Sequence, residues 1–174
     1  VATVSSLSVT SSAGADNFYV AADSIRVTVN FSEAVTVTGT PTISLLVGAT
    51  TRSASYISGS GTSALVFGYT VVSGDNDTDG VSVTANTLSA SGATINDAAG
   101  NVSTLTQAAV AASTSHKVDT TVPTVSIAAS STSLRSGQTS TLTFTLSEAA
   151  TDFVVGDITV SGGTLSSFAG SGSL

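Results

Sequence analysis

Hydrophobic and polar side chains alternate one by one over several short runs of this chain. The alternation is clearest in Ser24–Phe31, and it recurs in Leu65–Val71 and Leu142–Leu146. Successive side chains of a β-strand point to opposite faces, so a period of two predicts strands with one buried face. Gly, Ser, Asn and Asp bound these runs, as is typical of antiparallel strands joined by turns.

Further strands are predicted where short apolar or alternating runs lie between turn residues. These segments are Thr3–Val9, Thr42–Val47, Arg52–Ile57, Val81–Thr84 and Ser115–Val118. No stretch has a convincing helical pattern, and Leu105–Ala112 is the best candidate for a short helical turn. About seven short strands in roughly 100 residues are typical of a β-sandwich. The predicted fold class is therefore all-β.

The chain also repeats itself. Phe31–Val35 (FSEAV) recurs as Leu146–Ala150 (LSEAA), and Thr3–Ser5 recurs as Thr124–Ser126. Between the copies, Pro123 has no backbone N–H and would end any strand pairing. We therefore predict one repeat at residues 1–118, a short linker at 119–123, and the N-terminal half of a second repeat at 124–174.

The second copy is much shorter than the first. Half a sandwich would expose its inner face and leave strand edges unpaired, so it would not be stable alone. We expect either a segment of a longer tandem array or a chain completed by strands from a neighbour.

Composition narrows the class of protein. The 174 residues include no Cys, which excludes a disulfide scaffold and thiolate chemistry, and the net charge of −7 argues against nucleic acid as a partner. No apolar run approaches the ~20 residues of a membrane span, so membrane insertion is not expected. Few Lys residues, no Cys and many Ser and Thr favour an extracellular location. No secretion signal opens the chain, so we expect it to be removed or to lie in a longer parent.

The one dense cluster of charge contains Asp75, Asp77 and Asp79, followed by Gly80. Carboxylates this close repel one another, and a bound cation would neutralise them. Alternating acidic oxygens before a glycine are typical of a loop that wraps Ca²⁺. Asn86 stands where the helix-loop-helix calcium motif needs Glu, so that motif is excluded. The alternative is a solvated turn whose Asp and Asn side chains cap the backbone.

Five segments of the chain resemble the Ig-like and cadherin-like tandem repeats of large secreted, calcium-dependent bacterial adhesins of the RTX or biofilm type. They are Phe31–Val35, Tyr56–Ser63, Gly74–Gly80, Asp97–Asn101 and His116–Pro123. The resemblance implies tandem Ig-like antiparallel β-sandwiches, the second incomplete. It also implies extender rods on the bacterial cell surface, stiffened by Ca²⁺ where repeats meet, that support adhesion and biofilm formation. The implied partners are neighbouring Ig-like repeats of the same or an adjacent chain. A surface glycan or host ligand would bind elsewhere in the parent.

Alternate loops of an Ig-like sandwich lie at opposite ends, which groups the candidate calcium ligands. Glu33, Asp97 and Asn101 are expected together at the N-terminal end. The remaining candidates, expected at the end that faces the second repeat, are Asp16, Asp75, Asp77, Asp79 and Asp119, with Glu148 across the linker. For Asp97 and Asn101 the alternative is a turn held by side chain-to-backbone hydrogen bonds, and for Glu33 and Glu148 it is simple solvation.

Catalysis is not predicted. His116 is the only imidazole, and without a second His or a Cys it does not make a zinc site. Gly59–Gly61 contains a serine between glycines but lies between two predicted strands, whereas a nucleophile elbow links a strand to a helix.

Two other functions stay open from the sequence. The first is a subunit of a surface lattice or extracellular filament, completed by strand addition from a neighbouring chain. The second is a carbohydrate-binding accessory module, for which Phe18, Tyr19 and Tyr56 are the aromatic candidates.

Overall fold

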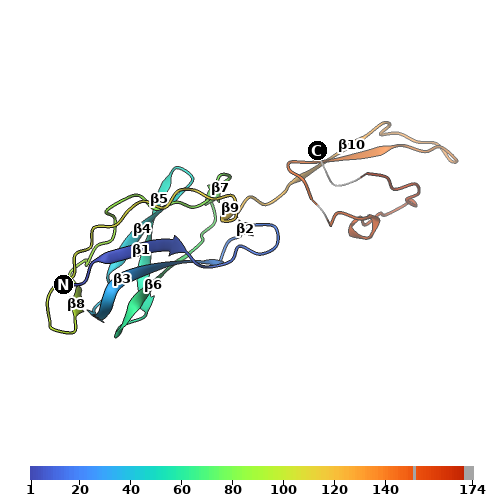
Figure 1. Ribbon diagram of the computed structural model, residues 1–174. Coiled ribbons are helices and arrows are strands. Elements are labelled where there is room, and N and C mark those ends of the chain that lie inside the picture. Colours follow the sequence, from blue (N-terminus) through green and yellow to red (C-terminus); the bar gives the residue numbers. More distant parts are fainter. Residues whose placement is uncertain (151, 171–174) are drawn as a thin grey trace. The chain divides into compact units, whose positions relative to one another are not determined.

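Strands dominate the structure, as the alternating pattern predicted. The computed structural model describes residues 1–150 and 152–170, and it divides into unit 1, Val1–Thr121, and unit 2, Val122–Leu174 (Figure 1). Residue 151 and the last four residues of the predicted second repeat, 171–174, lie outside the described residues. No helix in the described part of the chain is long and apolar enough to cross a membrane.

Unit 1 contains one large curled antiparallel sheet and one small sheet. The large sheet has the order β1-β3-β6-β5-β4, with β8 also paired to β3. Its strands are β1 (Val4–Val9), β3 (Ser24–Thr38), β4 (Thr42–Val47), β5 (Thr50–Ser58), β6 (Thr62–Thr70) and β8 (Thr94–Asp97). The small sheet has the order β2-β9-β7, from β2 (Phe18–Tyr19), β9 (Lys117–Asp119) and β7 (Asn76–Asp77).

The alternating residues of the strands form the core of unit 1. Ile25, Val27 and Val29 of β3 have no exposed surface, and Ile43 of β4 and Phe67 of β6 are equally buried. Each such side chain contributes on the order of 1.5–3 kcal/mol by leaving water. This burial explains why the period of two in the sequence was a reliable signal.

Strand β3 extends to Thr38, beyond the end predicted at Phe31. Its pairing with β6 shifts register between Asn30 and Val35, after which β3 pairs with β8. A shift of this kind bends a strand and lets it change partners. Glu33 therefore lies within β3 at the bend, and not in a loop after the strand.

The predicted helical turn at Leu105–Ala112 is wrong, because this segment is extended. Val110 forms an antiparallel bridge with Val83, and the buried Gln107 donates from Nε2 to the carbonyl of Thr84 at 2.8 Å. Residues 81–84, predicted as a strand, form only isolated bridges. Pairing with distant backbone overrides the weak local preference of this alanine-rich stretch.

Unit 2 begins with the same strand pair as unit 1. Strand β10 (Val125–Ala129) pairs with β11 (Leu142–Leu146), and Val125 lies opposite Leu146 as Val4 lies opposite Phe31. The hydrogen bond from the Ser147 N–H to the Thr124 carbonyl, 2.9 Å, also has its counterpart between Ser32 and Thr3, 2.8 Å. The internal repeat is therefore present in the structure as well as in the sequence.

The apolar face of this hairpin is largely uncovered. Ile127 is 61% exposed and Leu142 is 40% exposed, whereas Val27, which Leu142 matches in the repeat, is fully buried. Phe144 packs on Phe153, from the segment that also holds the short 3-10 helix η1 (Val155–Asp157). Among its described residues, unit 2 has only this two-stranded sheet. The fold is thus a tandem of Ig-like antiparallel β-sandwiches, the second incomplete.

Candidate functional site

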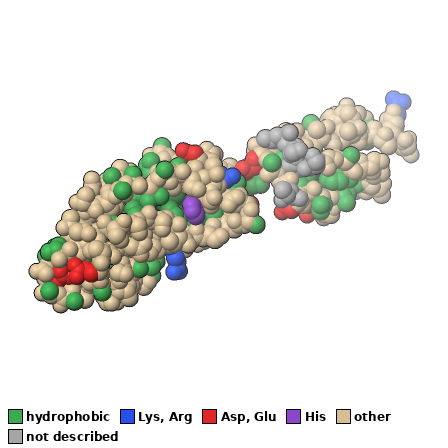
Figure 2. Space-filling model, in the orientation of Figure 1, with side chains coloured by type: hydrophobic (Ala, Val, Ile, Leu, Met, Phe, Trp, Pro, Cys, Tyr) green, Lys and Arg blue, Asp and Glu red, His purple; other side chains and the backbone are tan. Residues whose placement is uncertain are grey.

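The polar chemistry of unit 1 lies at its two ends. The N-terminus and β8 lie at one end, and β2, β7 and β9 lie at the other (Figure 1). Acidic side chains gather beside the N-terminus (Figure 2). Glu33 and Asp97 belong to this first end, and the acidic loop Asp75–Asp79 belongs to the second.

At the N-terminal end, Asp97 organises a tight turn. Its Oδ1 accepts hydrogen bonds from the backbone N–H groups of Ala99, at 3.0 Å, and Asn101, at 2.9 Å. The Asn101 side chain also donates to both carboxylate oxygens, at 3.2 and 2.9 Å. These bonds, those from Asn101 first, lower the pKa of Asp97 to about 2.

A cation lies between two carboxylates at this end. The N-terminal ammonium of Val1 is 3.2 Å from Asp97 Oδ2 and 3.4 Å from Glu33 Oε1. Both carboxylates raise the pKa of the ammonium, Asp97 most strongly. Glu33 and Asp97 are therefore placed to share one positive charge, and Asn101 contacts Asp97 beside it.

Acid should weaken unit 1 through Asp97. Its pKa is about 2 when folded and 3.8 ordinarily, so its contribution is full above pH 3.8 and is lost as the pH falls toward 2. We expect Asp97→Asn to be less stable at neutral pH and to show a flatter fall of the unfolding free energy over that range. Urea unfolding at several pH values measures this. Tyrosine fluorescence reports unit 1 alone, because Tyr19, Tyr56 and Tyr69 are the only three Tyr and there is no Trp.

Asp79→Asn is the matched control for this pH prediction. Asp79 is exposed and accepts no hydrogen bond from the described residues, so its variant should follow the wild-type pH profile. An Asp97→Asn profile parallel to the wild type would contradict the assignment.

At the other end, Asp75 is buried and bound to protein groups. Its Oδ1 accepts from Arg52 Nε at 2.8 Å and Nη2 at 2.5 Å, and its Oδ2 accepts from the Tyr69 hydroxyl. Burial alone would raise the pKa of Asp75, but hydrogen bonds from Tyr69, Val72 and Arg52 outweigh it and lower the pKa below its ordinary value. Burial first, and then the bond to Asp75, raises the pKa of Tyr69 to about 12.

Asp77 is also turned inward. Its Oδ2 accepts from the backbone N–H of Gly48 at 2.7 Å, and its Oδ1 accepts from that of Gly80 at 2.7 Å. Both glycines have positive φ, and a Cβ at Gly48 would lie 2.3 Å from the Asn76 carbonyl oxygen. Asp77 therefore fastens the loop to the β4–β5 turn at a place where only glycine fits.

The remaining candidate ligands of unit 1 have local hydrogen-bond partners or are exposed. Asp16 Oδ1 accepts from the N–H of Phe18 at 3.2 Å, and Asp119 Oδ1 accepts from that of Thr121 at 2.9 Å. Asp79 is exposed. In unit 2, Glu148 Oε1 is buried and has no hydrogen-bond partner among the described residues.

The acidic loop in this arrangement does not fit a divalent cation. The guanidinium of Arg52 already neutralises Asp75, and a metal ion beside it would face that positive charge. Within residues 1–150 and 152–170, no three His, Cys, Asp or Glu side chains are grouped to hold a metal ion. At the N-terminal end, Glu33 Oε1 and Asp97 Oδ2 lie 3.4 and 3.2 Å from one atom, the Val1 nitrogen, so these two carboxylates are close together. Metal binding by the nine candidate residues stays a prediction of the sequence.

Sequence reasoning missed the partners of the acidic loop. Arg52 lies on β5, 23 positions before Asp75, and Tyr69 lies on β6, six positions before it. The pairing of β5 with β6 brings the two side chains to the same carboxylate. One signal was available, because Arg52 is among only four Lys and Arg residues. A rare cationic side chain within a predicted strand indicates that a carboxylate lies nearby in the folded protein.

His116 has a structural place. Its ring stacks on Tyr19, with Nδ1 3.3 Å from the Tyr19 hydroxyl, which in turn donates to the Ser11 carbonyl at 2.9 Å. Burial lowers the pKa of His116. This contact helps to hold β9 beside β2.

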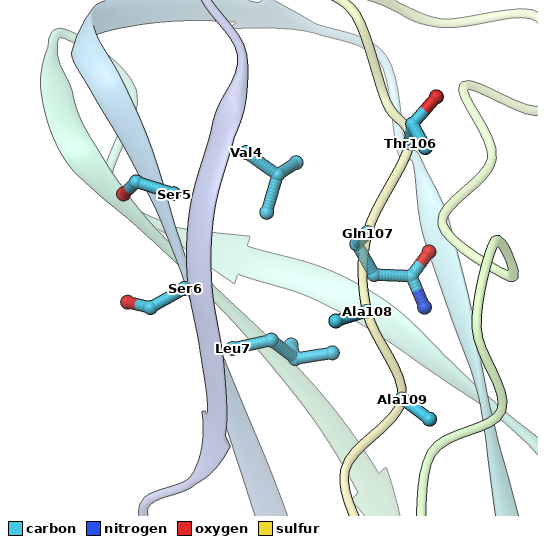
Figure 3. A pocket seen from close by; sticks show the side chains of 8 residues that line it. All are labelled: Val4, Ser5, Ser6, Leu7, Thr106, Gln107, Ala108 and Ala109. Carbon is cyan, nitrogen blue, oxygen red and sulfur yellow. The ribbon is translucent and has the colours of Figure 1, made fainter.

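A cavity of about 130 Å³ lies between β1 and the extended segment that follows β8 (Figure 3). Val4 and Leu7 point across it toward residues 106–109, while the Gln107 amide points away from it. Its lining has no titratable side chain. The cavity therefore offers no acid, base or charged ligand for chemistry.

The curled antiparallel sheet of unit 1 and the matching strand pair of unit 2 define the fold class as Ig-like β-sandwich, and the comparison with protein families agrees. Residues 119–174 match the family described as bacterial Ig-like domain, a family of non-enzymatic structural modules. The match supports a bacterial Ig-like repeat in this part of the chain, which suggests an extracellular repeat module. No curated protein and no solved structure matches the sequence.

Proposed function

We propose that this chain is a structural extender repeat of a large bacterial cell-surface adhesin, in which Ig-like modules follow one another and support adhesion and biofilm formation. The observation that carries the proposal is the repetition of one strand pair, β1–β3 in unit 1 and β10–β11 in unit 2, within a single chain. The bacterial Ig-like match over residues 119–174 supports it. A module of this kind acts by its length and stiffness, and needs no catalytic group.

We further propose that Ca²⁺ stiffens the array, held at the N-terminal end of unit 1 by Glu33, Asp97 and Asn101. Oxygen ligands of this kind suit a hard divalent cation, and Glu33 Oε1 and Asp97 Oδ2 lie close enough together to be 3.4 and 3.2 Å from the same atom. Calcium would offset the repulsion between these two nearby carboxylates. Extracellular modules typically bind Ca²⁺ with Kd of about 10⁻⁴–10⁻³ M, so fluids outside the cell would fill such a site.

Calcium should raise the thermal stability of unit 1 in the full chain. At a calcium concentration ten times Kd, binding to the folded state adds about 1.4 kcal/mol, which corresponds to a rise of several degrees in Tm. Melting curves followed by tyrosine fluorescence in calcium chloride and in EGTA measure the shift. Equal Tm values in the two conditions would contradict the calcium part of the proposal.

Two variants locate the ion. Glu33→Gln should abolish the calcium shift and leave the Tm in EGTA almost unchanged, because Glu33 is about half exposed and pairs only with the Val1 ammonium among the described residues. Asp79→Asn should keep the full shift. Loss of the shift in Asp79→Asn alone would move the ion to the acidic loop.

One observation favours a second function, a lattice or filament subunit completed by a strand from a neighbouring chain. The apolar face of β10–β11 is open, with Val125 50% and Ile127 61% exposed. Strands from a neighbouring chain could extend this sheet at its edges and supply the second layer that covers its apolar face. Light scattering on the same samples gives the mass, and a stable assembly of several chains would favour this function over the extender.

A further inference from the structure

We propose that Gly74–Asp77, which includes the first part of the acidic loop Asp75–Asp79, is a metal-independent clamp that holds the segment Asp119–Thr121, through which the chain leaves unit 1. The proposal deepens the extender function and rests on it for its biological meaning. It starts from two observations. Protein donors bind the carboxylates of Asp75 and Asp77, so the loop fits a divalent cation poorly. The same loop also forms hydrogen bonds to Thr120 and Thr121, which a solvated turn would not need.

The loop is fixed from the inside. The carboxylate of Asp75 is bound by Arg52 and Tyr69, and its Oδ2 also accepts from the Val72 N–H at 3.1 Å. Asp77 binds the backbone of Gly48 at 2.7 Å. These buried anchors leave the backbone of the loop, and the side chain of Asn76, free to act outward.

Outward, the loop binds the exit segment through four hydrogen bonds. Thr120 Oγ1 donates to the Asp75 carbonyl at 2.9 Å and accepts from the Gly74 N–H at 2.9 Å. Asn76 Oδ1 accepts from the Thr120 N–H at 2.9 Å and from Thr121 Oγ1 at 3.3 Å.

Pairing of β7 with β9 also holds the exit segment against the loop. Asn76 lies opposite Asp119 in the β7–β9 ladder, and Asp119 Oδ1 accepts from the Thr121 N–H. Thr120 is thus bound through both its hydroxyl and its backbone N–H, which fixes its side chain and its main chain. The exit segment therefore moves with unit 1, and rotational freedom toward the next repeat begins only after Thr121.

The test is the mobility of the Thr120 amide in the full chain, measured by ¹⁵N relaxation in EGTA. The clamp predicts an order parameter of about 0.85 without calcium, as in rigid backbone. Thr120→Val removes the hydroxyl but keeps the shape, and Asn76→Ala removes the acceptor. Each should lower the order parameters at positions 120 and 121 to below about 0.6. Thr120→Ser, the matched control, should keep the wild-type value.

Two results would overturn the clamp. One is a Thr120 order parameter below about 0.6 in wild-type protein in EGTA that rises when calcium is added. The other is an equal effect of Thr120→Val and Thr120→Ser. Tyrosine fluorescence melts of the same samples check that unit 1 is folded. Failure of the calcium shift alone would leave the clamp intact, so the two proposals fail separately.

Discussion

Removing Arg52 is expected to destabilise unit 1 by roughly 3 kcal/mol, because it leaves the carboxylate of Asp75 buried without a counter-charge. The Asp75 side chain has no exposed surface, whereas Arg52 is 31% exposed, which places the effect at the lower end for a broken buried ion pair. Urea unfolding of Arg52→Met at neutral pH, followed by tyrosine fluorescence, measures the loss.

The control for this variant is Arg26→Met. Arg26 is also on a strand but is exposed, and it forms no ion pair with the described residues. Its change should lie within about 0.5 kcal/mol of zero. The double variant Arg52→Met with Asp75→Asn should recover part of the loss, because no charge is then stranded. An equal effect of Arg52→Met and Arg26→Met would show that the buried pair contributes nothing.

Phe67→Ala should cost roughly 3–5 kcal/mol of unfolding free energy. Phe67 is fully buried on β6, and its ring packs edge-to-face on Tyr56 with centroids 6.0 Å apart. Truncation removes the apolar contacts and leaves a cavity between sheet layers that backbone pairing prevents from closing. The same fluorescence-detected urea titration gives the result.

Phe67→Leu tests whether the loss in Phe67→Ala comes from missing apolar volume or from the loss of the aromatic ring itself. Leucine keeps most of the apolar surface, so its cost should stay within about 1.5 kcal/mol. A loss below 1 kcal/mol in Phe67→Ala would mean that this part of the sandwich is not closely packed, and would contradict the described core.

The strands were predictable because their signal is local. Ile25, Val27 and Val29 alternate in the sequence and are buried in the structure, so the pattern alone placed β3. Its continuation to Thr38 was not predictable, because the bend near Glu33 depends on pairing with β8, which lies about sixty residues further along the chain. The extended course of residues 105–112 depends likewise on distant backbone.

The site was predictable in part. Loop positions in a sandwich predicted Glu33, Asp97 and Asn101 at one end, and the structure places these residues together although Glu33 lies within β3. The acidic loop was harder to interpret, because its spacing suits both a cation and a network of protein donors. Only the position of Arg52 across the sheet distinguishes the two, and no local pattern encodes it.

The most direct test of the whole account is an experimental structure of the full chain from crystals grown in millimolar calcium chloride. We predict that Asp75 keeps Arg52 and Tyr69 as partners, that Thr120 stays bound to Asn76, and that any calcium lies beside Glu33 and Asp97. Calcium bound within Asp75–Asp79, with Arg52 displaced, would contradict it.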